Sequence, residues 1–173
     1  MRGKRFQLVG AVAVLAVASV VTTTALAGGD REVRTRLTGF QEVPAISTDA
    51  SGKFSAKLRT SSQEIRYELS YAGLTGAVQQ AHIHLGQRAV NGGVSAFLCS
   101  NLGNGPAGTQ ACPAAPATIT GTIRPADVVG PADQGIDAMQ FDELVRAIRA
   151  GVTYANVHSA TFPGGEIRGQ LND

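Results

Sequence analysis

Residues 52–74 read GKFSAKLRTSSQEIRYELSYAGL, and this stretch decides the fold class. In its first half, Phe54, Ala56 and Leu58 alternate with polar residues. In its second half, the alternating apolar residues are Ile65, Tyr67, Leu69 and Tyr71. Such alternation is typical of strands that have one buried face. The polar residues SSQ between the two halves predict a hairpin turn, so the stretch predicts two paired strands.

Other segments with a strand-like pattern extend this prediction along the chain. They are REVRTRL (31–37), AVQQAHIHLG (77–86), VSAFLCS (94–100), ATITGTI (117–123), VTYANVHSA (152–160) and GEIRGQL (165–171). Pro125 ends the fourth of these segments, because proline cannot donate a ladder hydrogen bond. The loops between them are rich in Gly, Pro and small polar residues.

One segment has helical spacing instead. In GIDAMQFDELVRAIRAG (135–151), the residues with that spacing are Phe141, Leu144, Val145 and Ile148. Asp137 or Gln140 could begin this helix, and Gly151 ends it. We expect its apolar stripe to pack on the core, as surface helices normally do. The sequence therefore predicts an antiparallel all-β fold, a sandwich or a barrel, with one short helix.

The first 27 residues have the three-part pattern of a secretory signal peptide. Arg2, Lys4 and Arg5 form a basic start, an apolar run follows, and ALA at 25–27 offers a cleavage site. A retained membrane anchor is the alternative, but the apolar run is short for a span of ~20 residues. We predict a signal peptide over 1–27, a flexible lead over 28–30 and one domain over 31–173. The mature protein is then secreted, either extracellular or periplasmic, without a membrane span.

The charge of the mature chain excludes one class of partner. The chain has 15 basic and 13 acidic residues, and all three basic residues of the signal peptide are removed with it. The mature part then has 12 basic and 13 acidic residues, a net charge of −1. It has no basic stripe interleaved with aromatic residues, so the sequence does not support nucleic-acid binding.

The chain has two cysteines, Cys99 and Cys112, separated by the loop-like stretch SNLGNGPAGTQA. Export places them in an oxidising compartment, where pairing is expected. Two unpaired thiols are the alternative. Neither cysteine has a neighbour in sequence that would lower its pKa, so neither is expected to be a nucleophile.

The three histidines of the chain are His82, His84 and His158. His82 and His84 lie one residue apart on a predicted strand, so their side chains point to the same face ~6.6 Å apart. If the strand of His158 lies beside theirs, three imidazoles converge on one point. Such a set suits copper or zinc. The alternative is structural, because buried imidazoles also form hydrogen bonds to backbone carbonyls. The sequence leaves both interpretations open.

Other polar residues are weaker candidates. Glu166, Arg168 and Gln170 share one strand face, and could form a charged patch for a ligand. We expect instead that they form the solvated side of an edge strand. Glu42 lies in a loop and could be a ligand or a contact. Ser159 follows a histidine, but neighbouring strand residues point to opposite faces, so we expect no catalytic pair. No catalytic residue is predicted.

The order of several motifs resembles one known family. The stretches GFQEVP, SGKFSAKL, IRYELSYAGL, AHIHLG, NGGVSAFL, GTIRPADV and YANVHSATFPGGEIRGQL follow the order seen in the CHRD domain, the module first described in chordin. The resemblance implies an extracellular all-β domain of immunoglobulin-like or Greek-key type. A single domain behind a signal peptide is similar to the stand-alone bacterial members. The family implies no catalytic residue, and its two histidine motifs correspond here to His82, His84 and His158.

Three functions remain in consideration. The first, which is the function that we predict, is an extracellular interaction module, whose partner would be an unknown extracellular protein or surface component. The second is an exported copper- or zinc-binding protein with a three-histidine site, with redox activity as a further step. Copper–zinc superoxide dismutase is also a β-barrel with a histidine-x-histidine strand, but such an analogy does not establish function. The third is a structural role at the cell surface. We do not expect an enzyme.

Overall fold

The computed structural model describes residue 3 and residues 30–172. The predicted signal peptide over 1–27 lies outside the described residues apart from residue 3, and so does most of the lead over 28–30. The described strands are β1 Arg31–Thr38, β2 Ser51–Arg59, β3 Glu64–Ala72, β4 Val78–Leu85, β5 Val94–Ser100, β6 Ala117–Ile123, β7 Thr153–Ser159 and β8 Ile167–Gln170. The helix is α1 Phe141–Arg149, and short 3-10 turns are Gly39–Gln41, Thr60–Ser62, Pro125–Asp127 and Ala132–Gln134.

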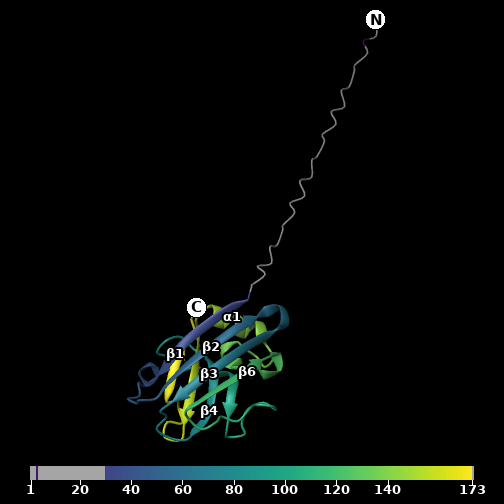
Figure 1. Cartoon of the computed structure of the whole chain (residues 1–173). Helices are drawn as coiled ribbons and strands as arrows, with labels where there is room; N and C mark the ends of the chain where they lie inside the picture. Colours follow the sequence, from purple (N-terminus) through teal and green to yellow (C-terminus); the bar gives the residue numbers. More distant parts are fainter. Residues whose placement is uncertain (1–2, 4–29, 173) are drawn as a thin grey trace.

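All eight strands form one sheet in the order β5-β4-β7-β8-β1-β2-β3-β6. Every neighbouring pair is antiparallel. The sheet curls into a nearly closed barrel (Figure 1). The predicted all-β antiparallel fold with one helix is therefore confirmed. Of the two predicted architectures, a sandwich and a barrel, the structure has the barrel. The predicted hairpin between β2 and β3 is also present, with Gln63 in the left-handed region at its turn.

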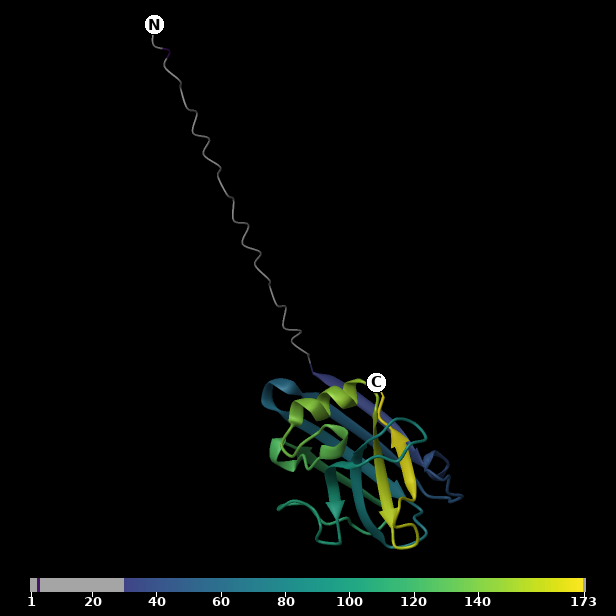
Figure 2. The same cartoon turned by 180° about the vertical axis from the view of Figure 1, so that it is seen from behind.

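The barrel interior is filled by the apolar positions of the alternating strands. Val33 and Leu37 from β1 and Phe54 and Leu58 from β2 are at most 1% exposed. The predicted apolar face of α1 is buried in the same core. Figures 1 and 2 show α1 at the end of the barrel where β1 begins. The helix stripe is thus part of the core, as expected from its spacing.

The barrel does not close by backbone pairing, because β5 and β6 are the two edges of the sheet. The segment after β6 adds a backbone bond from the Val129 amide to the Ser95 carbonyl of β5, and side chains bridge the rest of this seam. The Tyr67 hydroxyl, from β3, donates to the Leu98 carbonyl of β5 at 2.7 Å. The Gln110 amide donates to the Leu98 carbonyl, to the Thr120 carbonyl of β6 and to the Tyr67 hydroxyl. Gly121 of β6 leaves room for this crossing, since a Cβ there would lie 2.4 Å from the Tyr67 hydroxyl oxygen.

The loop that supplies Gln110 is held by the Cys99–Cys112 disulfide, so the predicted pairing is confirmed. The Tyr71 hydroxyl donates to the Pro113 carbonyl just beyond the disulfide, at 2.6 Å. The cysteine loop is therefore one of the segments that cover the open edge of the barrel. Among the described residues, no helix combines the length and the apolar character needed to cross a membrane.

Replacing Tyr67 by Phe tests the seam. The change removes the hydroxyl that joins β3 to the Leu98 carbonyl, and a lost buried hydrogen bond costs about 1 to 2 kcal/mol. We expect the free energy of unfolding, measured in urea, to fall by that amount. Thr120→Ala, at an exposed position of β6, is the matched control and is expected to change the free energy of unfolding by about 0.5 kcal/mol or less. Equal stability of Tyr67→Phe and wild type would show that the seam bonds are not stabilising.

Candidate metal centre

The three histidines lie on the outer face of the barrel wall, not in its apolar core. Ala81 and Ile83 of β4 are fully buried in the core, so alternation turns His82 and His84 to the opposite face. β7 pairs with β4 and carries His158 on the same outer face. These side chains are nevertheless buried, because loops cover this part of the wall. The expectation that the strands of the histidines are neighbours is met.

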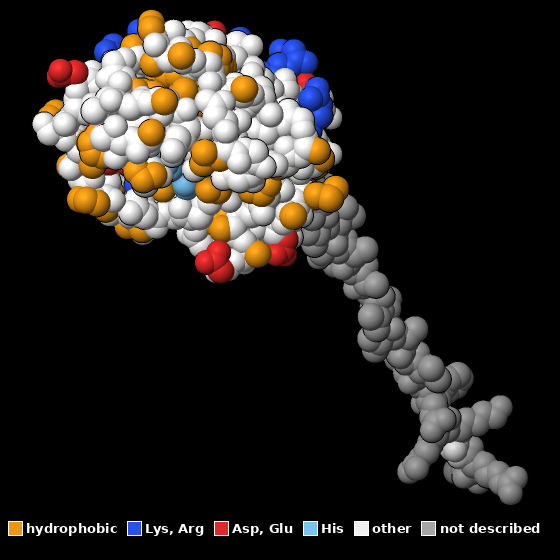
Figure 3. Space-filling model, turned by 90° about the horizontal axis from the view of Figure 1, so that it is seen from below, with side chains coloured by type: hydrophobic (Ala, Val, Ile, Leu, Met, Phe, Trp, Pro, Cys, Tyr) orange, Lys and Arg blue, Asp and Glu red, His pale blue; other side chains and the backbone are white. Residues whose placement is uncertain are grey.

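The covering loops are identified by their contacts with the wall. The loop before β5 places the Gly92 carbonyl on His84 Nδ1 at 3.0 Å. The loop before β8 places the Pro163 carbonyl on His158 Nδ1 at 2.9 Å. Asn91 joins the first loop to the segment after β1, donating to the Val43 carbonyl at 3.0 Å. Figure 3 shows a histidine side chain in a recess of the surface, with hydrophobic side chains around it.

The three imidazole rings form one compact cluster. Each ring offers one nitrogen to a set in which all three atoms lie within 4.8 Å of one another. His82 Nδ1 and His158 Nε2 are 3.2 Å apart. The exposed fractions of the residues are 2% for His82, 7% for His84 and 5% for His158. The cluster is therefore nearly closed to solvent, and small openings remain at His84 and His158.

Hydrogen bonding assigns the proton on each ring. A carbonyl oxygen only accepts, so Nδ1 of His84 and Nδ1 of His158 carry protons. The neutral His158 ring then has a lone pair on Nε2, which accepts from Nδ1 of His82. The Nε2 atoms of His82 and His84 are left as buried lone pairs without a hydrogen-bond partner. Buried imidazole lone pairs without a hydrogen-bond partner are available to a cation.

Electrostatics keep the cluster uncharged. Burial, together with the neighbouring His158 and His84, lowers the pKa of His82 to about 2. Burial lowers the pKa of His84 to about 4, although its bond to the Gly92 carbonyl acts in the opposite direction. Burial also lowers the pKa of His158. All three rings are thus neutral near pH 7, the form in which imidazole binds metals.

Tyr154 and Gly92 support His84 from two sides. The Tyr154 ring stacks on the His84 ring, with centroids 4.7 Å apart and planes at 5°. The Tyr154 hydroxyl accepts from the Gly92 amide at 3.2 Å. A Cβ at Gly92 would lie 1.6 Å from the Leu85 carbonyl oxygen, so only glycine fits there. The carbonyl that orients His84 is therefore held by a close approach of two backbone segments.

A carboxyl group joins the same buried layer. Glu42 Oε1 accepts from Asn156 Nδ2 at 2.6 Å, and Asn156 is the register partner of His82 on β7. Burial raises the pKa of Glu42 to about 7, against the Asn156 bond and the charge of Arg168, which lower it. The sequence left Glu42 open as a ligand or a contact. The structure makes it a contact of Asn156 and does not include it in the histidine cluster.

The sequence predicted that the polar residues of β8 form the solvated side of an edge strand, and this prediction is wrong. Glu166, Arg168 and Gln170 are at most 3% exposed, and β8 lies between β7 and β1, not at an edge. Their face of the strand is buried because the covering loops continue over it. The Arg168 guanidinium donates to the Gln87 and Val90 carbonyls and lies 3.4 Å from the centre of the Tyr154 ring. Arg168 thus fixes the loop before β5 above the tyrosine that stacks on His84.

Glu166 fixes a different part of the cover. Its Oε1 accepts from the Thr48 hydroxyl at 2.9 Å and from the Thr75 amide and hydroxyl at 2.8 Å. Burial raises the pKa of Glu166, but hydrogen bonds from Ser159, Thr75 and Thr48 outweigh it, so the pKa is lowered. The charged carboxylate therefore ties the segments before β2 and β4 to the barrel wall.

Sequence reasoning identified the histidines but missed Tyr154 and Asn156. A signal for both was present, because they precede His158 by four and two residues in one strand. Period-two spacing places all three on the same face. Gly92 had no comparable signal, since a close backbone approach is visible only in the folded chain.

The buried neutral histidines make the metal-free protein sensitive to acid. In the unfolded chain a histidine has a pKa near 6.5. Below that pH the unfolded chain therefore binds protons that His82, His84 and His158 do not bind in the folded protein, where their pKa values are lowered. Stability is fully present above about pH 6.5 and falls with pH. Glu42, whose pKa is raised to about 7, opposes this with one proton between pH 7 and 4.5. The histidine protons outweigh this single proton, so stability falls on acidification, by about 1.4 kcal/mol per pH unit for each excess proton that the unfolded chain binds.

Urea denaturation of the metal-free protein at several pH values between 7 and 5 measures this loss. His82→Gln is expected to flatten the dependence, because it removes one of the groups that titrate only on unfolding. Constant or rising stability on acidification to pH 5 would contradict the burial of neutral rings.

Two adjacent glycines, Gly164 and Gly165, allow a matched test of the packing around Asn156 and Glu42. Gly165 has φ +131°, and a Cβ there would lie 2.7 Å from Asn156 Nδ2 and 2.8 Å from Glu42 Oε1. Gly164 has open space around it and no such backbone conformation. We expect Gly165→Ala to lower the free energy of unfolding by about 1 to 3 kcal/mol through crowding and strain. Gly164→Ala is expected to change it by about 0.5 kcal/mol or less. Similar effects of the two changes would mean that Gly165 is not closely packed against Asn156 and Glu42.

The comparisons with known proteins identify the family. The model of the CHRD domain matches residues 33–171, which is nearly the whole described domain. No curated protein and no solved structure matched the chain. The matched residues include both histidine motifs, the cysteine loop and all of the covering loops described above. The resemblance seen in the sequence motifs is thereby confirmed, and the chain belongs to the CHRD domain family.

Proposed function

We propose that this protein binds one transition-metal ion, copper or zinc, through His82, His84 and His158. The observation that carries the proposal is the convergence of three buried imidazole nitrogens within 4.8 Å. Two of the rings are oriented by backbone carbonyls through Nδ1, which leaves Nε2 directed elsewhere. Metal-binding histidines in general have such a second hydrogen bond on the opposite ring nitrogen.

One pair of nitrogens in the cluster already has the spacing of two ligands of a single ion, and binding of the third ring requires the set to contract from its present span of up to 4.8 Å. Two nitrogens bound to one tetrahedral ion at ~2.0–2.1 Å lie about 3.3 Å apart. His82 Nδ1 and His158 Nε2 are 3.2 Å apart, which fits two ligands of a common ion as well as it fits a hydrogen bond. Binding through these atoms requires the proton of His82 to leave Nδ1. Nε2 of the same ring is a free acceptor for that proton, so the ring stays neutral.

A purely structural role explains the cluster less well. It leaves Nε2 of His82 and Nε2 of His84 buried without partners. An unmade hydrogen bond on a buried polar atom costs about 1 to 3 kcal/mol, so two of them are a substantial penalty. A cation bound by Nε2 of His84 removes the penalty of that atom, whereas Nε2 of His82 takes the proton from Nδ1 and stays without a partner. Among divalent ions, Cu²⁺ is expected to bind more tightly than Zn²⁺ at such a nitrogen site.

Calorimetric titration of untagged, metal-free protein with Cu²⁺ and with Zn²⁺ tests the proposal. We expect one equivalent of metal to bind, and His84→Gln and His158→Gln each to weaken binding at least 100-fold. Gln80→Ala is the matched control, because Gln80 lies on the same strand as His82 and opposite His158. It is expected to keep wild-type affinity. A bound metal should also raise the unfolding temperature of wild type alone, since ligand binding stabilises the folded state.

Two results would contradict the proposal. One is the absence of uptake by the wild-type protein at micromolar metal. The other is full binding by both histidine variants, which would place the metal elsewhere on the chain.

The setting we propose for this activity is outside the cytoplasm, in the periplasm or the extracellular space. The Cys99–Cys112 disulfide supports that setting, because disulfides persist in oxidising compartments. An extracellular interaction partner and a redox activity of the metal stay predictions of the sequence.

A further inference from the structure

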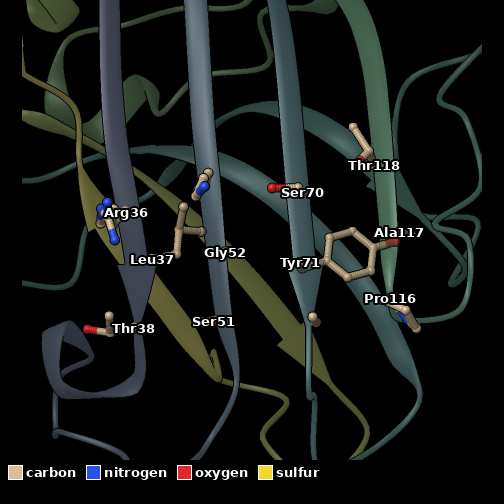
Figure 4. Close-up of a pocket in the computed structure, with 12 residues that line it drawn as sticks. Arg36, Leu37, Thr38, Ser51, Gly52, Ser70, Tyr71, Pro116, Ala117 and Thr118 are labelled. Carbon is tan, nitrogen blue, oxygen red and sulfur yellow. The ribbon is translucent and has the colours of Figure 1, made fainter.

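The outer face of β1, β2, β3 and β6 is open to solvent, unlike the covered face of β4, β7 and β8. One row of side chains crosses all four strands at the same level. Arg36 of β1 pairs with Lys53 of β2, Lys53 with Ser70 of β3, and Ser70 with Thr118 of β6. With strands ~4.8 Å apart, the row spans about 14 Å. Figure 4 shows Arg36 on β1, Ser70 on β3 and Thr118 on β6, around a pocket of this face.

This row contains an electrostatic anomaly. Arg36 and Lys53 are directly opposite each other, and like charges in that position destabilise a sheet. In the described part of the chain, neither side chain has a carboxylate oxygen within 4.0 Å. Nearby arginines are paired: Arg34 with Glu32 and Arg66 with Glu64, both at 2.8 Å.

The neighbouring rows do not share the anomaly. The row of Arg34 includes Glu68, and the row of Lys57 includes Glu32 and Arg66. The row of Arg36 has two cations and two hydroxyl groups but no acid. Its nearest acidic neighbour by register is Glu68, diagonal to Lys53. Two unpaired cations side by side are the arrangement that an external anion would neutralise.

The same row borders a surface pocket of about 500 Å³. That volume is within the range of small-molecule sites, ~300–1,000 Å³. Hydroxyl groups line it next to the cations, and Pro116 and Ala117 line its far end. Leu37 and Tyr71 also border it but are at most 2% exposed, so they offer little apolar surface to a ligand. The pocket therefore has cations at one end, hydroxyl groups along its length and the apolar residues Pro116 and Ala117 at the other end.

We propose that this pocket binds an acidic sugar of a uronate-containing polysaccharide. The carboxylate of one sugar lies between Arg36 and Lys53, where a guanidinium can bind it in a bidentate manner. The sugar hydroxyls form hydrogen bonds with Ser70 and Thr118 along the row. An oligosaccharide is long enough to follow the row across the strands.

Other anions fit the pocket less well. Single-stranded nucleic acids bind in large part through aromatic side chains on which bases stack. The outward-facing positions of the four strands, within the described residues, hold no aromatic residue. A free inorganic anion would use the cations but not the hydroxyl-lined remainder of the pocket. This proposal does not depend on the metal centre, which lies on other strands.

Calorimetry of the whole mature protein with tetragalacturonate, in metal-free buffer of low ionic strength, tests the proposal. We expect saturable binding that Arg36→Gln and Lys53→Gln each weaken at least tenfold. Lys57→Gln is the matched control: this lysine lies on the same outer face of β2, but its row contains Glu32, and binding is expected to stay within twofold of wild type. Glu68→Gln is expected to strengthen binding, because it removes the nearest negative charge.

Three further titrations test whether the ligand must be both acidic and a sugar. Maltotetraose, which is neutral, is expected not to bind, and raising the salt concentration is expected to weaken tetragalacturonate binding by screening. Inorganic phosphate is expected to bind at least tenfold more weakly than the oligomer. Wild-type protein that does not bind tetragalacturonate would overturn the proposal. So would equal losses in Lys57→Gln and Lys53→Gln, or phosphate binding as tight as that of the oligomer. Circular dichroism of each variant checks that it is folded.

Discussion

The structure depends on one constraint, the alternation of side chains along β4 and β7. Ala81 and Ile83 must face the apolar core, and this requirement places His82 and His84 on the outside of the barrel. Burial of a polar face is costly unless its groups have partners. The covering loops, the hydrogen bonds of their carbonyls and the buried charges of β8 all follow from the need to cover that face.

The result is a barrel with two different buried layers. Inside the wall, apolar side chains supply the hydrophobic stabilisation that any domain of this size needs. Outside the wall, on one side only, is a polar layer whose members are each fixed by a specific contact. Arg168 holds one loop through two carbonyls, and Glu166 holds two other segments through threonines. Such a layer offers a rigid arrangement of ligand atoms, which a metal site requires.

Much of this architecture could be predicted from the sequence, and the failures have physical causes. The strand patterns, the helix and the Cys99–Cys112 pairing follow from local periodicity and compartment, so the prediction was correct. The histidines were identified because spacing in a strand fixes their face. The burial of Arg168 was missed, because the alternation in GEIRGQL is the same whether the polar side meets water or a covering loop. The seam through Gln110 was missed for a similar reason, since it joins segments that are distant in sequence.

We propose that three imidazoles bind one ion at the outer wall of the barrel. X-ray absorption spectroscopy of the protein loaded with one equivalent of copper, and separately of zinc, tests it most directly. We expect three imidazole nitrogens in the metal's coordination shell, with bond lengths of ~2.0–2.1 Å for zinc. A shell with one imidazole or none, dominated by oxygen ligands, would contradict it and make His82, His84 and His158 structural residues.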